Sequence, residues 1–103
     1  PPLKVEISPP DPQAPLRAGE EYVVKCVVVG ARPPPTVSWW SGFERVLQAS
    51  VTTSADGNVT TSRLLLAPRP EDNGSTLRCI AETHSPPATL EDAWPLTVHS
   101  SRV

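Results

Sequence analysis

Adjacent carboxylates are the first residues in this sequence whose types suggest chemistry. They occur as the pairs Glu20–Glu21, Glu71–Asp72 and Glu91–Asp92, each near the expected end of a strand. Two carboxyl groups act as a general acid and base only when they converge on one substrate. Neighbouring residues of a β-strand point to opposite faces, so these pairs do not converge. We therefore expect them to be solvated turn charges.

The histidines and serines suggest no catalytic or metal site either. His84 and His99 are the only 2 histidines of the chain, one expected in a loop and one at a strand end. A zinc site needs more ligands than this. The sequence contains neither a G-x-S-x-G nucleophile elbow nor a glycine-rich phosphate loop. We expect no enzymatic activity, no cofactor, no metal and no small-molecule substrate.

The two cysteines are the best candidates for covalent chemistry. Cys26 and Cys79 lie in the alternating apolar runs "YVVKCVVV" and "STLRCIAE", so both should point into a core. They are either buried free thiols, as in intracellular domains, or a disulfide formed in an oxidising compartment. N-x-S/T sequons at Asn58 and Asn73 favour the disulfide and predict N-glycans in turns.

Length and charge limit the function classes further. A chain of 103 residues suits one domain, and a net charge of -2 does not favour nucleic acid or an anionic membrane as a partner. The sequence contains neither a membrane-spanning apolar run nor a signal peptide. We expect residues 1–103 to be one domain of a larger ectodomain, whose membrane anchor lies outside this fragment.

Period-2 apolar runs recur along the chain and predict the elements that hold these residues. With 14 prolines, they predict an all-β sandwich of about seven to nine antiparallel strands in two sheets. "ADGN" predicts a hairpin, residues 43–51 one or two short edge strands, and "SPPATLED" a loop before a last strand "AWPLTVHS". The side chains expected to point inward are Leu3, Val5, Ile7, Tyr22, Val24, Cys26, Val28, Leu64, Leu66, Leu77, Cys79, Ala81, Trp94, Leu96 and Val98.

The run "TVSWW" places two tryptophans on opposite faces of one strand. Trp39 shares its parity with Val37 and should enter the core, whereas Trp40 should lie outside. A cysteine strand, a tryptophan strand and a second cysteine strand resemble the framework of an immunoglobulin sandwich. That resemblance implies an inter-sheet disulfide between Cys26 and Cys79, with Trp39 packed on it.

One corner departs from the usual immunoglobulin pattern. In "EDNGSTLRC", Leu77 replaces the usual tyrosine, and one extra residue separates Asp72 from Cys79. Leu77 is expected in the core. The sequence does not decide whether Asp72 forms a salt bridge with an arginine. The leucine variant resembles the C2-type domains of the CD80, nectin and nephrin group of cell-surface proteins.

Longer segments narrow the resemblance. They are "PLKVEI", "PLRAGEEYVVKC", "GARPPPTVSWW", "DGNVTTSRLLLAP", "EDNGSTLRC" and "LEDAW". From Pro2 to His99 the chain resembles the second immunoglobulin domain of the insect sidestep family. Those are neuronal and muscle surface proteins that act in axon guidance and adhesion by binding Beaten path receptors. The resemblance implies immunoglobulin-superfamily partners, a preceding domain that holds the principal ligand face, and a role here as spacer with an accessory contact.

Trp40 is the residue we expect to make such a contact. On the outer face of its sheet it should lie near Arg78 and Ile80, with Glu82 beyond and Thr97 and His99 on the next strand. The alternative is that Phe43 or an arginine stem covers Trp40. Trp94 is expected in the core, or as a cap against a neighbouring domain.

The other sheet should turn Val23, Lys25, Val27, Arg63 and Leu65 outward, near the two sequons, where glycans would shield them.

The sequence is also compatible with two other classes of protein. One is a structural domain of an intracellular muscle or cytoskeletal protein, and the other is a soluble immune-type receptor.

Overall fold

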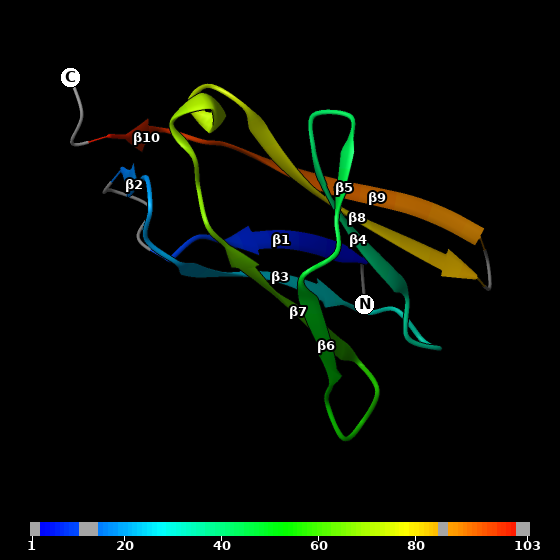
Figure 1. Ribbon diagram of the computed structural model, residues 1–103. Helices are drawn as coiled ribbons and strands as arrows, with labels where there is room; N and C mark the ends of the chain where they lie inside the picture. Colours follow the sequence, from blue (N-terminus) through cyan, green and yellow to red (C-terminus); the bar gives the residue numbers. More distant parts are fainter. Residues whose placement is uncertain (1–2, 11–14, 85–86, 101–103) are drawn as a thin grey trace.

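The fold is a two-layer β-sandwich, seen in a computed structural model that describes residues 3–10, 15–84 and 87–100 (Figure 1). It confirms the predicted all-β class, although the described residues contain ten strands rather than about seven to nine. The elements are β1 Lys4–Ser8, β2 Leu16–Arg17, β3 Tyr22–Val29, β4 Thr36–Ser41, β5 Glu44–Val46, β6 Ala49–Thr53, β7 Val59–Leu66, the 3-10 turn η1 Pro70–Asp72, β8 Thr76–His84, β9 Pro87–Pro95 and β10 Val98–His99.

Two four-stranded antiparallel sheets form the layers. Their strand orders are β1-β3-β7-β6 and β5-β4-β8-β9, so consecutive strands are often in different sheets. The predicted hairpin joins β6 to β7, and Gly57 adopts the positive φ of 76° that its turn requires. The short strands expected in residues 43–51 are β5 and β6, at the edges of opposite sheets.

The last third of the chain differs from its prediction. Residues of "PATLED" belong to β9, which pairs with β8 from Thr76–Pro95 to His84–Pro87. After Pro95 the chain leaves that sheet, and β10 runs parallel to β2. Ser85 and Pro86 of the predicted loop lie outside the described residues. Pro87 and the charges that follow it predict a loop, but they pair as a hairpin with β8, which ends at His84, and this pairing holds them in a strand. The expected single strand "AWPLTVHS" is therefore wrong.

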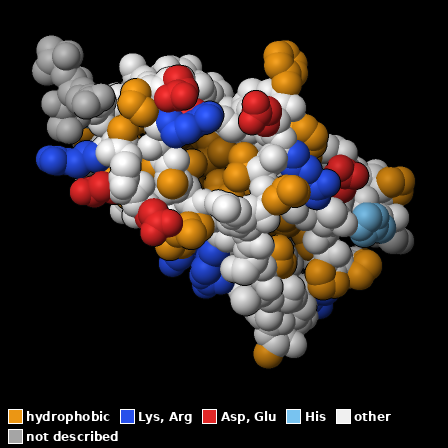
Figure 2. All heavy atoms as spheres, in the orientation of Figure 1, with side chains coloured by type: hydrophobic (Ala, Val, Ile, Leu, Met, Phe, Trp, Pro, Cys, Tyr) orange, Lys and Arg blue, Asp and Glu red, His pale blue; other side chains and the backbone are white. Residues whose placement is uncertain are grey.

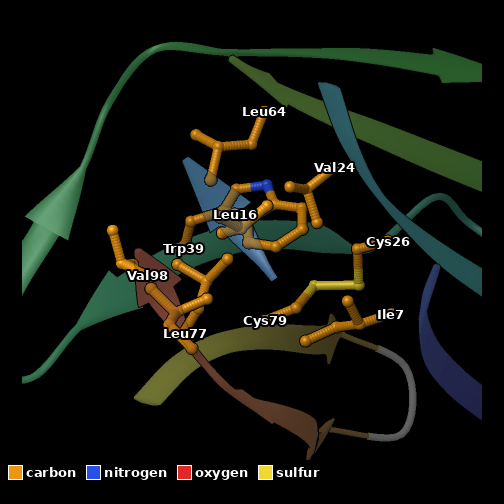
Figure 3. Close-up of a cluster of buried hydrophobic side chains, with 10 residues drawn as sticks. Ile7, Leu16, Val24, Cys26, Trp39, Leu64, Leu77, Cys79 and Val98 are labelled. Atoms are coloured by element: carbon orange, nitrogen blue, oxygen red, sulfur yellow. A yellow bond between two sulfur atoms is a disulfide. The ribbon is translucent and has the colours of Figure 1, made fainter. Parts of the chain in front are cut away.

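The core lies between the layers around the predicted disulfide, which the structure contains between Cys26 and Cys79 (Figure 3). Trp39 is 1% exposed and Leu77 is fully buried. Figure 3 shows the Trp39 ring beside the disulfide. The buried apolar residues are Ile7, Leu16, Val24, Cys26, Val28, Ala31, Trp39, Leu64, Leu77, Cys79, Ala81, Leu96 and Val98. Trp94 is half-buried and packs against this core from β9.

Two polar contacts join the sheets. The Trp39 indole N–H donates to the hydroxyl of buried Ser62 at 2.9 Å, so the largest core side chain leaves no unpaired donor. At the sandwich edge, the backbone N–H of Ile7 donates to a carboxylate oxygen of Asp92 at 2.8 Å. As a member of an adjacent carboxylate pair, Asp92 is predicted to be a solvated turn charge. That expectation is wrong because Asp92 shares the inward parity of Leu90 on β9 and is half-buried.

The corner before β8 is closed by a network that replaces the tyrosine. Asp72 accepts hydrogen bonds from the Arg69 backbone N–H at 2.8 Å and from its guanidinium at 3.1 Å. The salt bridge left open by the sequence therefore forms, and its partner is the arginine three residues earlier. Asn73 Oδ1 accepts the Val98 backbone N–H at 3.0 Å and ties the corner to β10.

The Asp72 carboxylate makes the free energy of unfolding depend on pH. Burial raises the pKa of Asp72, but the hydrogen bonds and charge of Arg69 outweigh it and hold that pKa below its ordinary value. Because the pKa of Asp72 is lower in the folded chain than in the unfolded chain, its carboxylate stabilises the fold fully above the unfolded pKa of about 3.9. That stabilisation is lost as the pH falls through the folded pKa. We expect Asp72→Asn to lower the free energy of unfolding by about 0.5–1 kcal/mol at pH 7.

Urea unfolding at pH 7 and at pH 2.5 measures this effect. The difference between the wild type and Asp72→Asn should shrink at the lower pH, because the Asp72 carboxyl binds a proton more readily in the unfolded chain than in the folded one. Glu71→Gln is the matched control, since Glu71 is exposed and should change little at either pH. A difference for Asp72→Asn that persists unchanged in acid would contradict the assignment.

Candidate protein-contact face

β4 sends its two tryptophans to opposite sides, as the alternation of "TVSWW" predicts. Trp39 is buried against the disulfide, and Trp40 lies half-buried on the outer face of the sheet. Trp40 is opposite Arg78 of β8 on one side and Arg45 of β5 on the other. We call the outer side of β5-β4-β8-β9 the contact face.

The residues around Trp40 form an open hollow of about 360 Å³. The structure brings Trp40, Arg78 and Ile80 together in it, the three side chains for which a protein contact was predicted. Pairing of β4 with β8 also sets Ser38 opposite Ile80. The lining residues are Thr36, Ser38, Trp40, Arg45, Arg78, Ile80 and Glu82.

Two kinds of side chain were candidates to cover Trp40, namely Phe43 and an arginine stem. Phe43 is 100% exposed in the β4–β5 turn, so it does not shield the ring. Arg45 and Arg78 flank Trp40 in register, where an arginine stem can pack on an aromatic side chain. The indole N–H of Trp40 donates to the Ser38 hydroxyl at 3.2 Å. A partner can therefore cover the ring without leaving its donor unpaired.

The contact face carries charged residues of both signs on β8 and β9. Arg78 pairs with Glu91 of β9 at 3.6 Å, with both side chains partly exposed. Glu82 lies four residues after Arg78 on β8, opposite Thr36 of β4. Thr36 in turn contacts His84, whose Nε2 is 3.1 Å from its hydroxyl. Figure 2 shows basic, acidic and hydrophobic side chains interspersed over the visible side of the molecule.

Two residues expected on this sheet are not part of it. Thr97 follows the end of β9, and His99 lies in β10 opposite Arg17 of β2. The prediction is wrong because the chain crosses to β2 after Pro95. The outer positions of β9 beside β8 are instead held by residues such as Glu91 and Ala93, opposite Ile80 and Arg78.

Arg45 is the contact-face residue that the sequence analysis missed. Its position depends on the tight turn at Gly42, which has a φ of 62° and sets Ser41 opposite Glu44. The segment "SGFE" was a signal for this turn, and counting back from it pairs Arg45 with Trp40.

The remaining candidates for chemistry do not gather into one site. Among residues 3–10, 15–84 and 87–100, no three His, Cys, Asp or Glu side chains lie close enough to hold a metal ion. Glu20, Glu21, Glu71 and Glu91 are exposed, as expected of solvated charges. The part of the chain that the structure describes also contains no helix of the length and apolarity needed to span a bilayer.

The asparagines of both sequons lie between strands and outside the contact face. Asn58 directly precedes β7, and its backbone N–H donates to the Asp56 carboxylate at 3.0 Å. Hydrogen bonds from Ser54 and then Asn58 lower the pKa of Asp56, which is fully exposed. Asn73 is exposed next to η1. Its Oδ1 accepts the Val98 backbone N–H at 3.0 Å.

A disulfide-linked sandwich with a buried tryptophan on the strand between its cysteine strands is an immunoglobulin domain. The chain matches the CD80-like C2-set immunoglobulin domain family over residues 4–89, and it belongs to that family.

Individual relatives agree with this family. Mouse nephrin is 35% identical over an alignment of 86 residues that covers 78% of this chain and 7% of nephrin. The chain thus spans only a small part of that relative's length.

Solved structures share the fold. Rst D1-D2 has a TM-score of 0.75 at 18% identity, over 95% of this chain and 50% of that one. The full ectodomain of mouse nectin-like molecule 4 has a TM-score of 0.71 at 18% identity, over 95% of this chain and 33% of that one.

Proposed function

We propose that this chain is an extracellular domain of a membrane-anchored adhesion or guidance protein, which acts as a spacer and makes an accessory protein contact. The observation that carries the proposal is the hollow around Trp40 on the contact face. A half-buried aromatic residue between arginines is typical of the centre of a protein–protein contact. Family membership and the Cys26–Cys79 disulfide support an oxidising location outside the cell.

The finer proposal is a sidestep-like protein whose partners are Beaten path-type receptors of the immunoglobulin superfamily. It is supported by the sequence segments that resemble the second domain of that family. In this proposal a preceding domain holds the main ligand face, and the chain carries N-glycans at Asn58 and Asn73. Neither sequon lies on β4, β5, β8 or β9, so glycans there would leave the contact face open.

A binding screen tests the proposal. The secreted chain, made multivalent so that weak contacts register, is presented to Beaten path and sidestep family ectodomains, alone and with the preceding domain attached. We expect Trp40→Asp to weaken binding by at least about tenfold, because it removes the aromatic side chain from the centre of the contact. Val23→Asp is the matched control on the other outer face, where Val23 is 48% exposed.

Equal binding by Trp40→Asp and the wild type, with both folded, would contradict a contact through this face. Binding that requires the preceding domain and ignores Trp40 would leave the chain as a spacer alone. Free thiols at Cys26 and Cys79 in native material would instead favour a structural role inside the cell.

A further inference from the structure

The contact face has opposite charges on either side of Ile80. Along β8, Arg78 lies two residues before Ile80 and Glu82 two residues after it, and side chains spaced by two share a face. On β4, Trp40 is opposite Arg78 and Thr36 is opposite Glu82. One end of the hollow is therefore basic and aromatic, and the other end is acidic and open.

This arrangement is self-complementary. Consider a two-fold axis that lies in the plane of the face, crosses β8 at right angles and passes through Ile80. Rotation about it sets Arg78 of one copy against Glu82 of the other, and Glu82 against Arg78. We propose that a second copy of this chain docks on the contact face about this axis. The inference rests on the proposed function, because it names the partner of the same face.

Shape supports the same pairing. The rotation brings Trp40 over the end of the second copy's hollow that Thr36 and Glu82 line. Ile80 meets its own copy near the axis, where an apolar contact suits the centre of an isologous interface. Sheets that pack face to face lie about 10 Å apart with interdigitating side chains, a separation that arginine and glutamate span together. Hydrogen-bonded to Ser38, the Trp40 indole brings no unpaired donor into the contact.

Glu91 is the one charge that this geometry opposes to itself. It lies opposite Ile80 on β9, so the axis brings the two copies of Glu91 toward each other. Each is 3.6 Å from Arg78 of its own chain, which offsets the repulsion. Removing the Glu91 carboxylate should therefore leave the association intact or strengthen it. Removing the Glu82 carboxylate, which faces Arg78 of the other copy, should weaken it.

Sedimentation equilibrium of the secreted chain, up to about millimolar concentration, tests the inference. We expect a monomer–dimer equilibrium, and we expect R78E and E82R each to raise its Kd by at least about tenfold, because like charges then face each other twice. An equimolar mixture of the R78E and E82R chains should form a heterodimer, since residue 78 of each chain again faces a residue 82 of opposite charge. The R78E/E82R double variant should recover self-association in part for the same reason, because its Glu91 has lost the Arg78 partner that offsets the repulsion between the two copies of Glu91.

Controls separate this pairing from general charge effects. Lys25→Glu reverses a charge on the outer face of the other sheet and should leave the dimer unchanged. Glu91→Gln should not weaken it. A chain that stays monomeric throughout, single reversals that leave the dimer unchanged, or a mixture that fails to associate would each overturn the inference.

The two proposals fail in different experiments. The ectodomain screen reads binding to a receptor, whereas sedimentation of the free chain reads self-association. Binding to a receptor there, together with a chain that is monomeric at all concentrations, would overturn only the self-association. A dimer with the predicted charge dependence, together with silence toward every ectodomain, would overturn only the receptor partnership.

Discussion

Replacing Trp39 with alanine is expected to lower the free energy of unfolding by about 3–5 kcal/mol, whereas the same change at Trp40 should cost about 1 kcal/mol. The two residues are adjacent and identical in type, so the difference isolates their environments. Trp39 is 1% exposed and hydrogen-bonded to Ser62, and its removal leaves a cavity and an unpaired hydroxyl. Trp40 is half-buried on an outer face, so its removal leaves no internal cavity, and the partly exposed Ser38 hydroxyl that it bonds can turn to water instead.

Chemical denaturation followed by circular dichroism measures both losses. Trp39→Ala removes a large part of the 5–15 kcal/mol that is typical of a domain, so Trp39→Phe is included as a milder variant. It keeps a ring but lacks the N–H donor, and it should fall between the wild type and Trp39→Ala. Equal losses for the alanine variants of the two tryptophans would contradict the assignment of one to the core and the other to the contact face.

The second large effect is expected from the disulfide. Replacing both Cys26 and Cys79 with alanine should cost about 4 kcal/mol, because the unfolded chain regains the freedom of a loop that spans 53 positions. The unfolded chain should also become more extended and expose more surface. The dependence of unfolding free energy on denaturant, the m-value, should therefore rise.

Val24→Ala is the control for this prediction. Val24 is fully buried in the same core, so the variant creates a cavity without removing a cross-link. It should lower stability and leave the m-value unchanged. A loss below about 1 kcal/mol for the double cysteine variant, with an unchanged m-value, would show that the cross-link does not restrict the unfolded chain.

Strict alternation made the central strands predictable. In β3, β4, β7 and β8 a period of two fixes which side chains enter the core, and Trp39 and Leu77 follow it without exception. The hairpin at Gly57 is predictable because its turn residues are adjacent in sequence. The cysteine framework is predictable because its spacing is well known. Such local signals carry over directly into the fold.

The edge of the sandwich was not predictable in the same way. Asp92 is charged and lies beside Glu91, which suggests a turn, yet pairing with β8 turns it inward to accept the N–H of Ile7. The crossing of the chain to β2 after Pro95 likewise depends on hydrogen bonds from Leu16 and Ala18 to Thr97 and His99. Those partners lie far away in sequence, and periodicity within one segment carries no information about them.

The contact face was predictable in part. Parity alone placed Trp40, Arg78 and Ile80 on one outer face, because β4 and β8 are neighbours in every immunoglobulin sandwich. The position of Arg45 required the register of a short edge strand. The open end beside Glu82 and Thr36, which gives the face its two-fold complementarity, follows from the pairing of β4 with β8 and not from either strand alone.

The most direct test of the central claim, that Trp40 and not Trp39 serves recognition, is an NMR titration of the indole N–H signals of the 3 tryptophans. The labelled chain is titrated with a Beaten path-type ectodomain and, separately, with excess unlabelled chain. The Trp40 signal should shift or broaden in at least one titration, while the Trp39 signal, buried and bonded to Ser62, stays in place. Binding that moves other signals and leaves Trp40 unchanged, or no change of Trp40 with either protein, would contradict the account.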